Sequence, residues 1–330
     1  MKKLLIATTA LVATGGMAAA DVTISGYGRF GLEYIEDRNN DPLAEDTVIS
    51  SRLRFNIDAT TETDVGVTFG ARLRVQYDDG DTYGDFNTAQ FSVGYEGLTV
   101  SVGNVDTAFD SVALTYNSEM GYQDFSYGDA DGGNTSNFFA YNSKGSISSV
   151  TPGYTGVAAT YSISGVNLYF SYVDPDQYAS SLPATVGEEL GIAADWTNGQ
   201  FSVAGSFVSN AAGVDGADLL FVGAAYNFGA GNVGLNYYDQ DILSIVPGDS
   251  GSQVTLWGDY NFGATTVKAY ISELDLDSGL NTDTAYGLGA DYSLGEGARL
   301  SGSIQSGWGD AASGWTNTST RADIGVRFDF

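Results

Sequence analysis

Strict alternation of apolar and polar residues recurs along almost the whole chain, and it constrains the possible fold more than any other feature. In residues 65–77 every odd position is apolar, whereas Arg72, Arg74 and Gln76 occupy even positions between them. A helix would repeat its apolar face about every 3.6 residues, so a period of two indicates a strand with one wet face and one apolar face. The last ten residues, 321–330, alternate in the same way and end on Phe330.

Sixteen such segments are predicted to form strands. They are residues 22–36, 49–60, 65–77, 88–95, 98–103, 157–163, 166–173, 188–196, 200–208, 218–228, 232–239, 253–262, 265–273, 284–294, 298–306 and 320–330. The connections alternate between tight, glycine-containing links such as Glu96-Gly97 and long polar loops such as 174–187. Residues 21–330 contain no apolar run long enough for a membrane-spanning helix. Closure into a barrel is the other way to cross a bilayer, and short turns alternating with long loops are typical of it.

The amino terminus predicts export. Residues 1–20 combine Lys2 and Lys3, a short apolar stretch and Ala18-Ala19-Ala20. This is the pattern of a cleaved signal peptide, and its apolar part is too short for a spanning helix. We therefore expect a signal peptide at 1–20 and a mature barrel at 21–330 beginning at Asp21.

The charge and the residue types that are missing exclude several classes of protein. The whole chain has a net charge of −28, and removing the charges of Lys2 and Lys3 gives −30. Such acidity argues against a nucleic-acid partner, which needs clustered basic residues. The chain has no Cys and no His, so disulfides, thiol nucleophiles, the usual zinc ligands and histidine acid–base chemistry are absent. No catalytic constellation is visible, and we expect no enzymatic activity.

One connection, residues 104–156, is far longer than the others and rich in acids and aromatics. A loop of this length in a compact fold is usually functional. Its aromatic side chains need a packing partner, and the barrel interior is the obvious one. Its acidic residues are candidates for a charged wall in the pore: Asp106, Asp110, Glu119, Asp124, Asp129 and Asp131.

Taken together, these features resemble the general porins of Gram-negative bacteria, the sixteen-stranded trimeric family, and most closely its alphaproteobacterial branch. The likeness covers the whole chain and includes Ile24-Ser25-Gly26-Tyr27-Gly28-Arg29 in the first strand, the long third loop and the terminal Phe330. Residues 262–270 and 285–290 also have the family's character. The resemblance implies an outer-membrane location in contact with lipid, a homotrimer, and a third loop that folds into the lumen opposite an arginine cluster.

The arginines of this chain supply such a cluster independently of the resemblance. All of them except Arg38 occupy inward-facing positions of predicted strands. Those strands become neighbours around the ring once the barrel closes. Counting residues from the short-turn rim predicts that Arg327 lies near the rim, outside the cluster. The count places six others at one depth as the basic wall of the constriction: Arg29, Arg52, Arg54, Arg72, Arg74 and Arg321.

The sequence thus predicts an all-β, sixteen-stranded antiparallel transmembrane β-barrel with a long inward-folded third loop. Its expected function is passive diffusion of ions and small hydrophilic solutes through a water-filled channel, with a modest preference for cations. Two alternatives stay open: a substrate-specific channel of the same architecture, and a secreted acidic calcium-binding β-rich adhesin. No cofactor is expected, although weak calcium binding at Asp129 and Asp131 is possible in so acidic a loop.

Overall fold

The computed structural model describes residues 21–38, 43–130, 137–144, 155–175, 187–243, 249–309 and 320–330. The predicted signal peptide therefore lies outside the described residues. Most of the described chain is strand, with a four-residue helix and a short 3-10 turn, η4 (Ala211–Gly213). The elements are β1 (Asp21–Ile35), β2 (Thr47–Glu62), β3 (Thr68–Asp78), β4 (Asp85–Phe86), β5 (Gln90–Tyr95), β6 (Leu98–Gly103), α1 (Ala108–Ser111), β7 (Thr155–Ile163), β8 (Val166–Asp174), β9 (Glu189–Thr197), β10 (Phe201–Ser209), β11 (Asp218–Asn227), β12 (Gly231–Gln240), β13 (Gly251–Asn261), β14 (Thr265–Leu276), β15 (Ala285–Gly295), β16 (Ala298–Ser306) and β17 (Thr320–Asp329).

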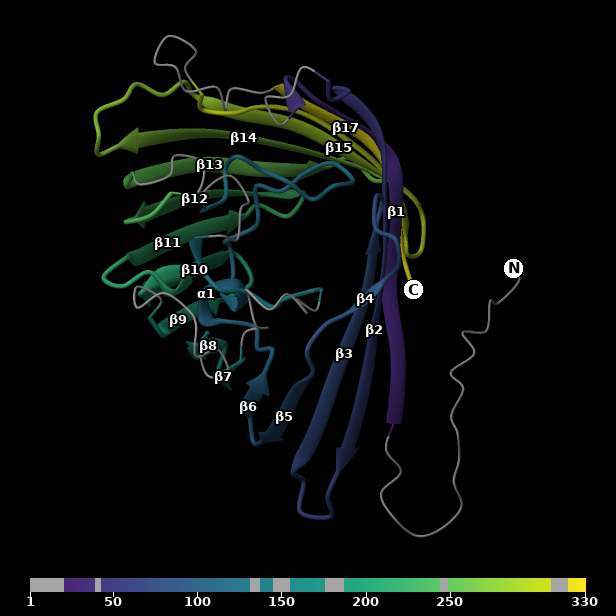
Figure 1. Ribbon diagram of the computed structural model, residues 1–330, viewed down its shortest axis with the longest axis vertical. Coiled ribbons are helices and arrows are strands. Elements are labelled where there is room, and N and C mark those ends of the chain that lie inside the picture. Colours follow the sequence, from purple (N-terminus) through teal and green to yellow (C-terminus); the bar gives the residue numbers. More distant parts are fainter. Residues whose placement is uncertain are drawn as a thin grey trace.

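The strands form one closed antiparallel barrel. Each strand pairs with its neighbour in the chain, and β17 pairs with β1 to close the ring. The two-residue β4 and the six-residue β5 both pair with β3, so they are two parts of one interrupted strand. Counted in this way, the barrel has the predicted sixteen strands, and the predicted fold class is confirmed. In Figure 1, β1 to β4 form one side of the ring and β9 to β13 the opposite side.

Burial is reversed relative to a water-soluble protein, as the alternation predicts for a barrel in lipid. Apolar residues such as Ile24 and Ile192, which are 61% and 54% exposed, face outward. Polar residues such as Asn236, Gln253 and Thr255 face inward and are fully buried. These three residues are buried because the third loop covers them.

The tight links have the backbone conformation that the sequence suggested. Glu96 and Gly97 have φ values of 46° and 85°, and Ser164 and Gly165 have values of 51° and 81°. Two consecutive residues with positive φ match the twist of the flanking strands in a two-residue hairpin, and glycine adopts that conformation at least cost. These links therefore close hairpins at one rim of the barrel.

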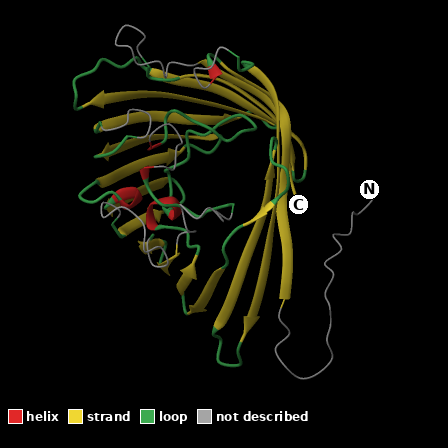
Figure 2. Ribbon diagram, viewed as in Figure 1, coloured by secondary structure: helices red, strands yellow, loops and turns green. Residues whose placement is uncertain are grey.

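The long segment after β6 folds into the barrel rather than away from it. In Figure 1 the segment that carries α1 lies inside the ring of strands, and Figure 2 shows its helical turns there. A cluster of buried apolar residues from this loop, including Phe109, Met120 and Phe138, packs against inward side chains of β9–β14 such as Phe221 and Trp257. The main apolar core of the described chain therefore lies in the lumen, between the loop and one wall. None of the described helices is long and apolar enough to cross a membrane.

Candidate functional site

The third loop begins by attaching to β8 and β9. Thr107 caps α1, since its Oγ1 accepts a hydrogen bond from the Asp110 amide at 3.4 Å. The Ala108 amide donates to Ser171 Oγ on β8 at 3.0 Å. The Ala113 amide donates to Asp195 Oδ2 on β9 at 3.2 Å. Because side chains of the barrel wall satisfy the backbone amides of the loop, this part of the loop has a fixed position.

The middle of the loop is bound to β12, β13 and β14. Asn236 Nδ2 donates to the Leu114 carbonyl at 2.8 Å, and Tyr238 OH donates to the Thr115 carbonyl at 3.0 Å. Further along, Thr255 Oγ1 donates to the Gly128 carbonyl at 2.7 Å. These residues occupy inward-facing polar positions of the alternating strands. On this wall, the inward-facing polar side chains therefore form the surface that binds the loop.

The tip of the loop, residues 121–124, crosses to the strands where the two ends of the chain meet. The Tyr122 amide donates to Asp323 Oδ1 on β17 at 3.0 Å, and Gln123 Nε2 donates to Ser50 Oγ on β2 at 2.9 Å. Asp124 forms salt bridges with Arg29, Arg299 and Arg327. The tip therefore contacts the opposite side of the barrel from α1, and the loop divides the lumen.

The returning segment, residues 137–144, lies beside the start of the loop. The Phe139 amide donates to Glu189 Oε2 at 2.9 Å, and the Asn142 amide donates to Asn104 Oδ1 at 2.9 Å. Lys144 Nζ lies 2.8 Å from Asp78 Oδ2 on β3. This segment brings Tyr141 and Ser143 toward the arginines of β2 and β3.

A polar cavity of about 670 Å³ lies between the loop and β2–β3. Its barrel side is formed by Arg52, Arg54, Arg74 and Gln76. Its loop side includes Asp106, Asp110, Tyr141 and Ser143. Basic residues from one side and acidic residues from the other thus face a common space.

The arginines that line the cavity are held by different kinds of partners. Arg52 forms a salt bridge with Asp78. Arg54 Nε donates to Gln76 Oε1 at 2.7 Å, and its guanidinium lies 5.0 Å from the centroid of the Tyr27 ring. Arg74 donates to Ser143 Oγ at 2.6 Å and lies 4.4 Å from the centroid of the Tyr141 ring.

Among the described residues, no carboxylate lies within salt-bridge distance of Arg54 or Arg74. Their positive charges are therefore directed at the cavity, because the partners that orient them are neutral.

The two acidic residues on the loop side have different environments. Asp106 Oδ2 accepts a hydrogen bond from Gln90 Nε2 at 3.0 Å. Asp110 accepts hydrogen bonds from Tyr116 OH at 2.8 Å and from the Tyr141 amide at 3.2 Å. Burial raises the pKa of the Asp110 carboxyl above its usual range, and the nearby charge of Asp106 raises it further.

The structure brings only part of the predicted basic wall to the cavity. Arg52, Arg54 and Arg74 line it, whereas Arg72 is paired with Asp58 at 2.6 Å. Arg29 donates to the Gln123 carbonyl at 2.5 Å and so binds the loop tip. Arg321 is paired with Glu33 and lies 3.9 Å from the centroid of the Phe125 ring.

The predicted acidic residues are also divided. Asp106 and Asp110 line the cavity, and Asp124 binds the arginines at the tip. Asp129 is buried between the loop and the wall. Glu119 lies near the same wall but is partly exposed, and its carbonyl accepts a hydrogen bond from Lys268 Nζ at 3.3 Å. Asp131 lies outside the described residues. The described part of the chain contains no group of three or more acidic residues that could hold a metal ion.

Arg327 was predicted to lie outside the basic wall of the constriction, and it is not among the residues that line the cavity. Arg327 pairs in register with Arg29 on β1 and with Arg299 on β16, and both Arg299 and Arg327 contact Asp124. Counting residues from the rim did not reveal this row, because the strands of a barrel are staggered and equal counts on different strands do not give equal depths. The register of strand pairing, which follows from the hairpin turns and the alternation, could have identified this row.

Comparison with known proteins agrees with this geometry. The family model described as Gram-negative porin matches residues 7–312. The chain is 56% identical over 313 residues to a porin of Fuscovulum blasticum, covering 94% of this chain and all of the relative, and 27% identical over 330 residues to a porin of Rhodobacter capsulatus. Among solved structures, two engineered variants of the Rhodopseudomonas blastica porin are 56% identical, with TM-scores of 0.81 and 0.82, and cover 94% of this chain.

Membership of this family decides between the alternatives that the sequence left open. A channel catalyses no reaction, so the expectation that the chain is not an enzyme is confirmed. The secreted-adhesin alternative is wrong, because the likeness to the porins covers nearly the whole chain. The chain belongs to the Gram-negative porin family, and it forms a general porin channel in the outer membrane.

Proposed function

We propose that the narrowest part of this channel lies between Arg52, Arg54 and Arg74 of the wall and Asp106 and Asp110 of the third loop. Ions and small hydrophilic solutes cross it by passive diffusion. The observation that supports this proposal is the single polar cavity that both groups of residues line. The gap between loop and wall sets the size limit, and the opposed charges set a transverse field that acts on each passing solute.

The charges around the cavity suggest how the channel selects ions. Three guanidinium groups face two carboxyl groups, and burial favours the neutral form of one of these, Asp110. The narrow part alone therefore does not favour cations. The net charge of −28 lies mostly in acidic loop residues, which concentrate cations at the channel mouths. We propose a modest cation preference that arises mainly outside the constriction.

Zero-current potentials in a planar bilayer under a KCl gradient test this proposal. The expected sign is potassium-favouring, and it should weaken as salt rises because mobile ions screen the loop charges. A chloride-favouring potential at low salt would overturn the selectivity proposal while leaving the channel itself intact.

Two substitutions at the constriction test its position. Arg74→Gln should shift the potential toward cations, and Asp106→Asn should shift it toward anions, because each removes one charge from the cavity. Arg72→Gln is the matched control: it lies two residues away on the same strand but is neutralised by Asp58. We expect it to give a smaller shift than Arg74→Gln. Equal shifts for Arg72→Gln and Arg74→Gln would place the narrow part elsewhere.

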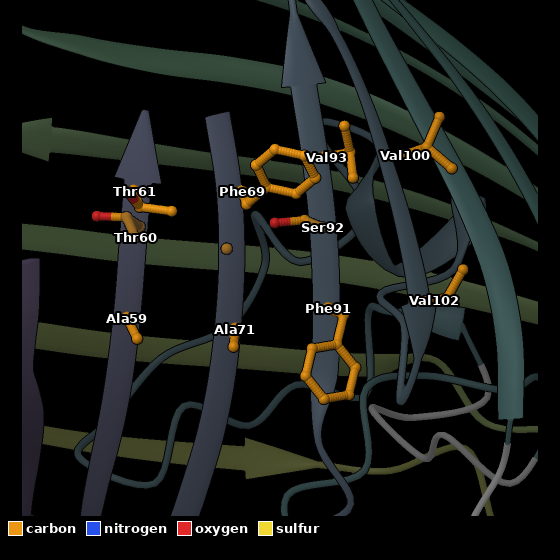
Figure 3. Close-up of a pocket in the computed structure, with 11 residues that line it drawn as sticks. Ala59, Thr60, Thr61, Phe69, Ala71, Phe91, Ser92, Val93, Val100 and Val102 are labelled. Carbon is orange, nitrogen blue, oxygen red and sulfur yellow. The ribbon is translucent and has the colours of Figure 1, made fainter. Parts of the chain in front are cut away.

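We also propose that this porin is a homotrimer whose copies meet at the wall formed by β2, β3, β5 and β6. β5 and β6 each have only six residues, whereas a strand needs about 9–11 residues to span the bilayer. The outward face of this wall carries an apolar hollow of about 600 Å³ (Figure 3), which is lined by Phe69, Phe91 and Val102 and by the small residues Ala59 and Ala71. A short wall with an apolar hollow is better covered by protein than by lipid, and the number three follows the family.

Mass measurement in detergent tests the interface. Wild-type protein should be trimeric, and Ala71→Arg should yield smaller species because it places a charge in the hollow. Ala224→Arg on β11 is the control, since Ala224 also faces outward but lies on a different wall, where it is exposed. A trimer that survives Ala71→Arg, or a monomeric wild type, would reject this interface.

Weak calcium binding at Asp129 and Asp131 stays a prediction. Calcium titration of the purified protein by calorimetry tests it directly. Asp129→Asn should abolish any heat of binding if the prediction is correct.

A further inference from the structure

Arginines of four neighbouring strands form one lateral row across the barrel closure. In register, Arg299 of β16 is opposite Arg327 of β17, Arg327 is opposite Arg29 of β1, and Arg29 is opposite Arg52 of β2. Four positive charges in adjacent positions repel one another unless acids oppose them. Arg52 has its own partner, Asp78 of β3. The other three share a single carboxylate, that of Asp124 at the tip of the loop.

The contacts of Asp124 hold the loop from three strands. Its Oδ1 lies 2.7 Å from Arg299 Nη2, and its Oδ2 contacts Arg327 Nη1 and lies 3.9 Å from Arg29 Nη1. Arg299 and Arg327 have second acids, Asp291 at 3.9 Å and Asp329 at 3.2 Å. Within the described chain, Asp124 is the only carboxylate in salt-bridge distance of Arg29. Arg29 is only 7% exposed, so it depends most on this acid.

The local backbone is adapted to this docking. Gly121 has φ +74°, and a Cβ at this position would lie 2.1 Å from Asp323 Oδ2, so only glycine allows the tip to approach β17. On the wall, a Cβ at Gly325 would lie 2.6 Å from Cγ of Tyr122. The Tyr122 ring therefore packs into the space that this glycine leaves. Asp124 has φ +49°, a conformation that Asp and Asn tolerate better than other non-glycine residues.

We propose that Asp124 is a positioning residue that latches the third loop to the barrel closure and masks three wall arginines from the pore. The latch has two effects that differ from those of the acids lining the cavity. It keeps the loop tip on the wall, which keeps the open channel steady. It also neutralises a cluster that would otherwise attract anions. The proposal rests on the proposed role of the third loop in narrowing the channel.

Single-channel recording of Asp124→Asn, using the full-length porin purified in detergent, tests the latch. Asn preserves the shape and tolerates the positive φ, so the substitution removes mainly the charge. We call the open state without current fluctuations the quiet open state. Its mean lifetime should fall by at least about tenfold, the ratio that corresponds to a loss of ~1.4 kcal/mol. We also expect the zero-current potential to shift toward anions. Arg299→Gln, which removes one of the three contacts, should shorten the quiet state by a smaller factor, and it should not shift the potential toward anions because it removes a positive charge.

The Asp106→Asn variant distinguishes the effect of releasing the loop tip from the effect of removing one negative charge from the pore. Asp106 lines the cavity but does not contact the tip arginines, so its neutralisation should shift the potential without shortening the quiet state. If Asp106→Asn shifts nothing, the proposed constriction fails while the latch is still tested by the lifetime of Asp124→Asn. If the open state of Asp124→Asn is as quiet as that of wild type, the latch is rejected.

A cross-link provides a rescue that only a latch predicts. The chain contains no cysteine, so Ser50→Cys and Gln123→Cys introduce a unique pair at a site where the native side chains are in contact. In the Asp124→Asn background, a short bis-methanethiosulfonate reagent, which forms a disulfide with each cysteine and releases methanesulfinate, should restore the quiet open state. It should not restore the potential, because the missing charge is not replaced. Failure of the cross-link to quieten the channel would overturn the mechanical part of the proposal.

Discussion

Two walls of this barrel have the same alternating sequence pattern but use their inward faces differently. On β8–β14 the inward residues are mostly small or neutral, such as Ser171, Asn236 and Thr255, and the third loop buries them. On β2 and β3 the inward residues include Arg54 and Arg74, which face an open cavity. The comparison shows that the inward-facing polar residues of a barrel strand can either bind a loop or line a pore.

The largest effect should come from removing an apolar anchor on the loop-bound wall. Phe109 of α1 is fully buried, with ring centroids 4.5 Å from Phe138 and 6.0 Å from Phe221. Phe109→Ala should weaken loop docking by about 3–5 kcal/mol, as other buried aromatic truncations do. Limited proteolysis should then cut the loop while the barrel stays intact. Phe91→Ala, on the outward face, is the control and should leave the loop resistant.

Alkaline pH should loosen the same wall by ionising a buried acid. Burial raises the pKa of Asp129 to about 8, and one of its carboxyl oxygens has no hydrogen-bond partner. The docked loop binds this proton more tightly than the released loop does. Docking is therefore strongest below about pH 4, the usual pKa of Asp. It weakens as the pH rises toward 8 and changes little above that.

Proteolysis of the loop at pH 6 and pH 9 measures this effect, and the loop should be cut faster at pH 9. Asp129→Asn cannot ionise at this position, so the difference in cutting rate between the two pH values should be smaller than in wild type. A wild-type loop equally resistant at both would show that the Asp129 carboxyl does not control docking.

The smallest effect should come from a single hydrogen bond on the loop-bound wall. Ser171→Ala removes the acceptor of the Ala108 amide and should weaken loop docking by about 1 kcal/mol. On the open wall, Arg72→Gln breaks a partly exposed ion pair with Asp58 and should change loop docking by much less. If Arg72→Gln loosened the loop more than Ser171→Ala, as seen in proteolysis rates, the two walls would not be separate in function.

Much of the barrel could be predicted from the sequence, because strand alternation and hairpin turns are local properties. The inward phase of Arg52, Arg54 and Arg74 followed from the period of two, and the structure places all three on one cavity. The path of the loop was less predictable. Asp129 was expected at the pore, yet it is buried between the loop and the wall. Whether a loop acid reaches the pore or the wall depends on contacts with strands more than a hundred residues away, such as those of Gln253 and Tyr238.

The sequence by itself determined the sixteen strands, the lipid and lumen faces, the family and the long acidic loop, because each depends on short-range pattern or overall resemblance. The tertiary structure decided which charges oppose one another. Strand register brought Arg299, Arg327 and Arg29 into one row, and the folded loop delivered Asp124 to that row and Asp106 to the cavity. Electrostatic partnership depends on distances of a few ångströms, and those are fixed only when the barrel has closed and the loop has packed inside it.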